Sequence, residues 1–190
     1  MRKIYPLILL LISVLSFARH AQAQTLVGSG QTYTTLKAAF DAINTGTLTG
    51  VVVLQITSST TEPATAALNA TGGSANYSSV TIYPTGSGYT ISGSVAGAII
   101  QLNGADYVTI DGRVNQSGAK DLIIQNTNTS NSTIQLTADA TYNTVKYCVI
   151  KGATTSTSNG IVLISTGTSI GNDNNTIDNN DINANGTAVN

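Results

Sequence analysis

The stretch NNTIDNNDIN (residues 174–183) contains five asparagines, two isoleucines and two aspartates. It repeats an earlier stretch, because NTVKYCVI (residues 143–150) aligns with NTIDNNDI (residues 175–182) at an offset of 32 residues. Further upstream, YVTIDG (residues 107–112) fits the same template, with Thr109 and Ile110 standing 35 residues before Thr144 and Val145. Repeats of about 20 to 50 residues predict a stacked fold, since one unit cannot bury its apolar face alone.

A second set of segments repeats beside the first, namely IIQLNGAD from Ile99, TIQLTAD from Thr133 and NGIVLIS from Asn159. Each unit therefore predicts three short strands separated by Asn, Gly or Ser. The expected strands cover residues 98–102, 108–111, 122–125, 133–136, 144–147, 149–150, 161–164, 176–178 and 181–182. Residues 51–57 and 80–84 are expected earlier strands, with a polar excursion over residues 58–79 between them. We thus predict an all-β, right-handed parallel β-helix, also called a solenoid.

The repeat explains the composition of residues 174–183. We expect Ile177 and Ile182 to point into the core from consecutive strands, with Asn179 and Asn180 at the corner between them. Asparagine tolerates the left-handed backbone of a tight corner, and its amide can bond the same amide one coil away.

The segment TYTTLKAAFDAINTG (residues 32–46) predicts an amphipathic helix over residues 35–45. Leu36, Ala39, Phe40 and Ile43 have i, i+3, i+4, i+7 spacing, Thr34 or Thr35 can cap the start, and Gly46 follows the end. We expect this helix to cover the open first coil within an N-terminal cap at residues 24–50. Residues 51–190 are the expected coils. NGTAV (residues 185–189) resembles the opening of a further copy, so we expect an array truncated at its C-terminus.

Residues 1–23 have the pattern of a signal peptide. Arg2 and Lys3 precede an apolar run, and Ala21-Gln22-Ala23 forms a small-x-small cleavage site. The run is shorter than the roughly 20 residues of a membrane span. We expect a mature chain that starts at Gln24, has no membrane span, and is secreted or displayed on the outer cell surface.

The composition excludes several function classes. The single histidine, His20, lies in the predicted signal peptide, so residues 24–190 provide no histidine for a catalytic triad, a general base or a zinc site. These residues carry five basic and nine acidic side chains, a formal charge of −4, and offer nucleic acid no basic patch. Cys148 has apolar and aromatic neighbours in VKYCVI, which predicts a buried, unreactive thiol.

The helix motif GSGQTYTTLKAAFDAI, followed by VTIDG and NNTIDNNDI, resembles the right-handed parallel β-helix superfamily of pectate lyases, pectin methylesterases and many bacterial surface proteins. The run from VTIDGR through GNDNNTIDNNDI is more closely similar to large secreted bacterial β-helix-repeat proteins of the type IX secretion pathway. That resemblance implies an adhesin or a polysaccharide-associated protein. The superfamily hosts many functions, so it implies no particular reaction.

The resemblance directs the search for catalytic residues to acidic and basic side chains. Lyases of the superfamily use acidic calcium ligands and a basic residue, and its esterases use paired aspartates and an arginine. The nearest candidates are Asp106, Asp111 and Arg113 in ADYVTIDGR. The repeat also predicts that Asp111, Lys146 and Asp178 form an exposed acid–base–acid ladder at the strand spacing of roughly 4.8 Å.

Three ligand hypotheses remain open. Asp173, Asp178 and Asp181 around GNDNN are candidate calcium ligands, although the spacing of known calcium loops is absent and no cofactor is expected. Tyrosine faces could bind sugars, and the candidates are Tyr33, Tyr77, Tyr83, Tyr89, Tyr107, Tyr142 and Tyr147. Spaced threonine pairs on a solenoid could bind ice, the candidates being Thr127/Thr129, Thr155/Thr157 and Thr166/Thr168, but they fall in loops of unequal length.

The leading hypothesis is a non-catalytic scaffold or adhesin that contacts polysaccharide or cell-surface glycans. We expect its open last coil to stack on downstream coils of the parent chain or to self-associate. The alternative is the N-terminal part of a polysaccharide lyase or another carbohydrate-active enzyme with its active site further downstream. An all-β sandwich is the alternative fold.

Overall fold

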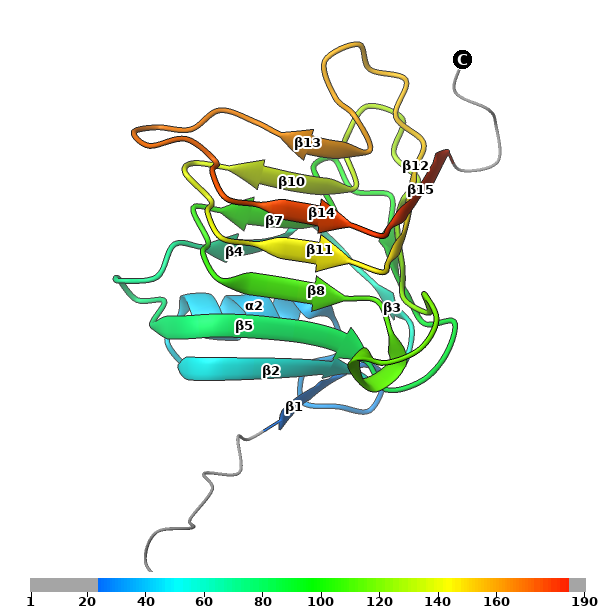
Figure 1. Cartoon of the computed structure of the whole chain (residues 1–190). Helices are drawn as coiled ribbons and strands as arrows, with labels where there is room; N and C mark the ends of the chain where they lie inside the picture. Colours follow the sequence, from blue (N-terminus) through cyan, green and yellow to red (C-terminus); the bar gives the residue numbers. More distant parts are fainter. Residues whose placement is uncertain (1–23, 185–190) are drawn as a thin grey trace, which may run out of the picture.

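The computed structural model describes residues 24–184 and shows a parallel β-solenoid (Figure 1). The predicted signal peptide and the NGTAV segment lie outside the described residues. The chain runs through three sheets in turn, and one passage through all three is called a coil here. Every pairing between the described strands is parallel. This excludes the sandwich, whose sheets are antiparallel.

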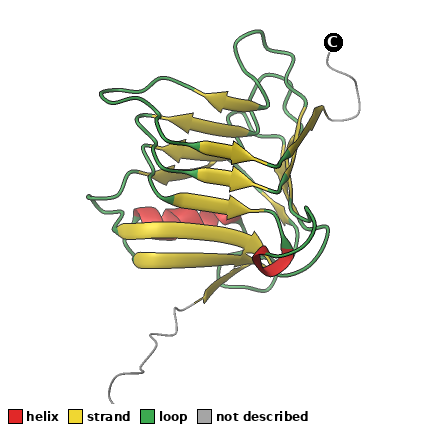
Figure 2. Cartoon of the chain, viewed as in Figure 1, coloured by secondary structure: helices red, strands yellow, loops and turns green. Residues whose placement is uncertain are grey.

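Sheet A contains β1 (Gln24–Val27), β2 (Gly50–Ile56), β5 (Tyr77–Pro84), β8 (Val108–Asp111), β11 (Thr144–Lys146) and β14 (Thr176–Asp178). Sheet B contains β3 (Thr60–Thr61), β6 (Thr90–Gly93), β9 (Ile123–Asn126), β12 (Val149–Gly152) and β15 (Asp181–Ala184). Sheet C contains β4 (Ala66–Asn69), β7 (Ile100–Asn103), β10 (Ile134–Thr137) and β13 (Val162–Ile164). The helical elements are α2 (Leu36–Asn44) and the short 3₁₀ helix η1 (Val114–Gln116) (Figure 2).

The register of the coils confirms the sequence alignment. Val145 lies between Ile110 and Ile177 in sheet A, and Ile150 lies between Ile124 and Ile182 in sheet B. Alternate strand residues point inward, and Ile110, Val145, Ile124 and Ile150 belong to one continuous buried core. Ile177 and Ile182 continue these two stacks in the last described coil but are 37% and 46% exposed, so the expectation that they are core residues is not met among the described residues.

The predicted polar excursion over residues 58–79 was wrong, because it contains β3 and β4, which complete the first coil. Ala66 and Leu68 of β4 are fully buried and pair with Ile100 and Leu102 of β7. Strands β1 and β6 were also missed; β1 pairs with β2, which places residues 24–27 of the expected cap in sheet A. These segments are held as strands by pairing with a neighbour rather than by their own hydrophobic pattern.

Helix α2 confirms the predicted amphipathic segment. Its four predicted apolar residues are buried, and the Thr35 hydroxyl accepts a hydrogen bond from the Ala38 N–H. Such N-caps are worth about 1 kcal/mol. Thr35 and Thr45 flank the helix as its N-cap and C-cap residues.

Two side chains attach α2 to the first strands of sheets B and C. The Asn44 side chain donates to the Ala67 carbonyl oxygen at 2.8 Å and accepts from the Asn69 N–H at 3.0 Å, so it occupies the free edge of β4. Glu62, which follows β3 and is buried, accepts hydrogen bonds from the Leu36 and Lys37 N–H groups at 3.0 and 2.9 Å. The helix thus satisfies an edge that would otherwise be open to pairing.

The asparagine corners differ in one detail from the prediction. Asn179 adopts a left-handed backbone with φ of 51°, as expected for the corner between β14 and β15. Asn180, however, bonds the backbone of the preceding coil, accepting from the Cys148 N–H and donating to the Val145 carbonyl oxygen, both at 2.8 Å. The expected bond between stacked amides cannot form there, because the equivalent residue one coil earlier is Cys148.

Candidate functional site

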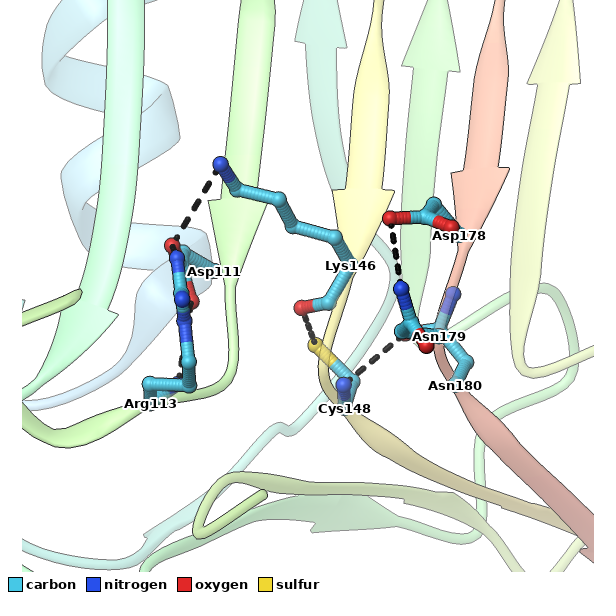
Figure 3. Close-up of polar contacts among 7 residues, drawn as sticks. All are labelled: Asp111, Arg113, Lys146, Cys148, Asp178, Asn179 and Asn180. Atoms are coloured by element: carbon cyan, nitrogen blue, oxygen red, sulfur yellow. Dashed lines mark hydrogen bonds and ion pairs between the residues drawn. The ribbon is translucent and has the colours of Figure 1, made fainter. Parts of the chain in front are cut away.

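The predicted charged ladder lies on the outer face of sheet A (Figure 3). Lys146 pairs in register with Asp111 of β8 and Asp178 of β14. The Lys146 Nζ lies 3.6 Å from the Asp111 Oδ2. The Asp178 carboxylate accepts a hydrogen bond from the Asn179 side-chain amide at 2.9 Å. The register of the ladder is therefore confirmed.

The expectation that the ladder is exposed was wrong at Asp111, whose side chain is only 1% exposed. Arg113 folds back over it and donates from the backbone N at 3.1 Å, from Nε at 2.9 Å and from Nη2 at 2.6 Å. The Arg113 guanidinium also stacks on the Tyr147 ring, 4.1 Å from its centroid. A bidentate arginine and a neighbouring ring make this carboxylate part of a packed corner.

Electrostatics keep Asp111 ionised. Burial alone would raise its pKa, but the hydrogen bonds and charge of Arg113, with the charge of Lys146, hold the pKa below its usual range. The same pairing raises the pKa of Arg113. A carboxylate with a lowered pKa, held by a bidentate arginine, is suited to fixing the corner, whereas a general acid would need a raised pKa.

The structure separates the other acidic candidate from Asp111. Asp106 precedes β8, so it lies at the opposite end of the strand from Asp111, and its Oδ1 accepts hydrogen bonds from the Thr141 N–H and hydroxyl, both at 2.7 Å. Asp106 therefore holds a turn of the next coil. Asp111 and Arg113 come together as the sequence predicted, but Asp106 does not join them.

The three candidate calcium ligands do not converge. Asp181 pairs with the Lys120 Nζ at 2.5 Å, Asp178 bonds Asn179, and the backbone carbonyl of Asp173 accepts from the Tyr142 N–H. Within residues 24–184, no group of three or more His, Cys, Asp or Glu residues could hold a metal ion. The three carboxylates that the calcium hypothesis names are therefore not gathered into one cluster of acidic ligands among the described residues.

Tyr107 and Tyr142 are the exposed members of the tyrosine candidates. Their rings stack with centroids 5.3 Å apart and planes 8° from parallel, and each residue is about half exposed, at 55% and 52%. Tyr77 and Tyr83 are buried, and Tyr33 lines a cleft of about 320 Å³ beside β1. The pair occupies matching corners of consecutive coils, so the 35-residue offset could have revealed it in the sequence.

A threonine column lies on the outer face of sheet A, and two of its members follow Tyr107 and Tyr142 by two residues in the chain. Thr81, Thr109, Thr144 and Thr176 pair successively across β5, β8, β11 and β14. The sequence analysis did not predict this column, although the repeat alignment already matches Thr109 with Thr144 and Thr144 with Thr176. The predicted threonine pairs instead lie in loops, where Thr155 bonds the Thr129 carbonyl oxygen. We name Tyr107, Tyr142, Thr109 and Thr144 the tyrosine–threonine face.

Cys148 is fully buried, as the sequence predicted. Burial raises the pKa of its thiol to about 12, and the charge of Asp111 acts in the same direction. A thiol of this kind is unreactive at neutral pH.

No helix within residues 24–184 has the length and hydrophobicity needed to cross a membrane. Comparison of the chain with protein-family models, curated proteins and solved structures gives no match.

Proposed function

We propose that this protein is a non-catalytic scaffold of the secreted or cell-surface β-helix type and binds a neutral glycan on the tyrosine–threonine face. The predicted signal peptide supports the location. The parallel solenoid supports the proposed relation to the pectate-lyase-like superfamily and to the type IX secreted repeat proteins. The observation that carries the glycan proposal is the exposed Tyr107–Tyr142 stack.

The tyrosine pair has the properties of a sugar contact. A tyrosine ring offers an apolar surface to the C–H groups of a sugar, and its hydroxyl remains a hydrogen-bond donor and acceptor. The rings stack on one another, which holds both in place before any ligand arrives. Ordering a side chain on binding costs about 0.5–1.5 kcal/mol, so a fixed pair keeps more of its contact energy.

The surroundings favour a neutral ligand. Thr109 and Thr144 add hydroxyl groups in register along the same face. The nearest charged column is internally compensated, because Asp111 contacts both Arg113 and Lys146. A polymer with many hydroxyl groups and no net charge fits such a surface better than a polyanion does.

The test is affinity electrophoresis of residues 24–190 in gels that contain neutral polysaccharides, such as xylan, glucan or mannan, with pectate as the charged comparison. We expect at least one neutral polymer to retard the protein. The double substitution Tyr107→Ala/Tyr142→Ala should abolish the retardation, and Thr144→Val should weaken it. Gln101→Ala/Asn103→Ala on the outer face of sheet C is the matched control and should leave the retardation unchanged.

Retardation by no polymer, or equal retardation of the tyrosine variant and wild type, contradicts the glycan proposal. Incubation of the retarding polymer with the protein separates the enzyme alternative, since a lyase or hydrolase would release new chain ends over time. N-terminal sequencing of protein from culture medium or the cell surface tests the location, and a start at Gln24 is the expected result.

A further inference from the structure

Tyr107 and Tyr142 hold their phenol rings against one another from consecutive coils. Each tyrosine stands two positions before a member of the register pair Thr109–Thr144, and both have the same left-handed backbone, with φ of 57° and 56°. The Tyr107 N–H donates to the Thr141 carbonyl oxygen at 3.3 Å, so the hydrogen bonding of sheet A reaches these corners. Equal backbone geometry in adjacent coils explains why the two rings lie nearly parallel, with their centroids 5.3 Å apart.

The pair is open to reagents in solution. Tyr107 and Tyr142 are 55% and 52% exposed, whereas Tyr83 is buried and the Tyr147 ring is covered by the Arg113 guanidinium. Among the tyrosines of residues 24–184, these two form the one pair of stacked rings. They therefore combine contact between two phenols with access from solvent.

This exposure does not depend on the last coil. Tyr142 already has a described coil on either side of it, because the third equivalent corner is Asn174, which has φ of 55°. The Tyr142 N–H donates to the Asp173 carbonyl oxygen of that coil at 3.2 Å. The half-exposed ring of Tyr142 is thus a property of a corner inside the stack of coils.

Two stacked phenols are suited to oxidative coupling. Removal of one electron and one proton from a tyrosine gives a phenoxyl radical, whose unpaired electron is shared by the oxygen and by the two ring carbons ortho to it. Two such radicals join through ortho carbons to give dityrosine. In free solution the radicals must meet by diffusion, but here the rings are already in contact, and holding two reactants together in this way greatly raises their effective concentration.

We propose that Tyr107 and Tyr142 form a dityrosine cross-link on exposure to a one-electron oxidant generated from hydrogen peroxide. One C–H bond ortho to each hydroxyl breaks, one C–C bond forms between the rings, and each tyrosine is oxidised by one electron. Hydrogen peroxide takes up the two electrons and the two protons and becomes two molecules of water. The reaction requires no glycan, so it is independent of the proposed function.

The cross-link joins the coil of β8 to the coil of β11. Its two ends are 35 residues apart in the sequence. A covalent bond between residues that are distant in the sequence stabilises a folded chain mainly by restricting the unfolded chain. The modified protein should therefore resist unfolding better than the unmodified protein.

The test is oxidation of the purified protein at low concentration with a peroxidase and hydrogen peroxide, in the absence of polysaccharide. We expect a monomer that has lost two hydrogen atoms by intact mass and that emits the blue fluorescence of dityrosine. After trypsin digestion, tandem mass spectrometry should find fragment 38–113 joined to fragment 121–146 through Tyr107 and Tyr142. The midpoint of urea unfolding should shift to a higher concentration.

Phenylalanine variants provide the controls. Tyr107→Phe and Tyr142→Phe each keep a ring in the stack but remove one hydroxyl, so each should abolish the cross-link. Tyr89→Phe is the matched control, because Tyr89 packs against the core and belongs to no stacked pair of the described residues. It should cross-link as wild type does. Oxidation of wild type in urea should form the link more slowly, since unfolding separates the rings.

Four results would overturn the proposal. They are oxidation of the folded protein without an intramolecular cross-link, cross-links only between chains, a cross-link that survives Tyr107→Phe, and coupling in urea as fast as in the folded protein. None of these results bears on glycan binding, which is measured without an oxidant. The two proposals therefore stand or fall separately.

Discussion

Glu62 joins the N-terminus of α2 to the first coil, and its removal should uncouple the two. One carboxylate accepts three hydrogen bonds, from the Leu36 and Lys37 N–H groups and from the Thr60 hydroxyl at 2.8 Å. Glu62 is 3% exposed, so little water is available to replace it. The carboxylate also compensates the positive end of the helix dipole.

The magnitude follows from these contacts. A buried donor left without a partner costs about 1–3 kcal/mol, and hydrogen bonds to charged groups contribute about 1.5–3 kcal/mol. The Lys37 N–H and the Thr60 hydroxyl can partly rebind water or neighbours, so we expect Glu62→Ala to destabilise by about 2–4 kcal/mol. Glu62→Gln should destabilise the protein by about half as much as Glu62→Ala, because the glutamine amide keeps one acceptor but places a donor against one of the two N–H groups.

The assay is urea unfolding combined with native-state hydrogen exchange. Because coils contact only their neighbours, the loss of protection should concentrate in α2, β3 and β4 and leave β11 and β12 protected. Asp41→Asn is the control. It breaks the exposed Lys37–Asp41 pair on the same helix, which should change stability by less than about 0.5 kcal/mol. A Glu62→Ala effect as small as the control, or one spread evenly over all coils, would refute the reasoning.

Three further predictions concern the later coils. A hydrogen bond from the Thr168 hydroxyl, with backbone N–H donors, lowers the pKa of Asp139 to about 2. The ionised Asp139 carboxylate therefore contributes fully to stability above about pH 4, and this contribution is lost as the pH falls through about 2. In acid unfolding titrations, the difference in stability between wild type and Asp139→Ala should close over that window. Asn180→Ala removes two bonds to the preceding coil and should cost about 1–3 kcal/mol, with faster exchange of the Cys148 amide; unchanged exchange contradicts this. Cys148 should react with a thiol reagent only at the rate of unfolding, and faster labelling under native conditions contradicts its burial.

The sequence predicted the regular coils because their signals are local and repeated. The strands β8 and β14 match their predicted ranges, since isoleucine or valine at a fixed repeat position and asparagine or glycine at the corner mark each strand. The segments that failed lack these signals. Strand β3 has two residues and β4 is rich in alanine, so both owe their extended backbone to the strands that stack on them.

The site was predicted less completely, because its contacts join different coils. The spacing brought Asp111 and Arg113 together, but the burial of Asp111 depends on Arg113 stacking on Tyr147 of the next coil. After Arg113 the chain turns through Asn115 and Gln116, which both have positive φ. A residue pattern along one coil does not contain this information.

Inward-facing and outward-facing strand positions differ in the substitutions that they tolerate. Inward residues such as Ile110, Val145 and Ile150 are fixed by stacking, since a polar substitution there leaves a buried group without a partner. Outward residues in a shared column are constrained only by pairing with neighbours, which accepts threonines, a tyrosine pair or alternating charges. The fold therefore places any recognition surface in these outward columns, where one substitution per coil extends a ligand contact by one strand spacing of about 4.8 Å. Under the proposed function the stacked Tyr107 and Tyr142 would be such an extension, and a glycan that spans both coils would lose binding when either ring is removed.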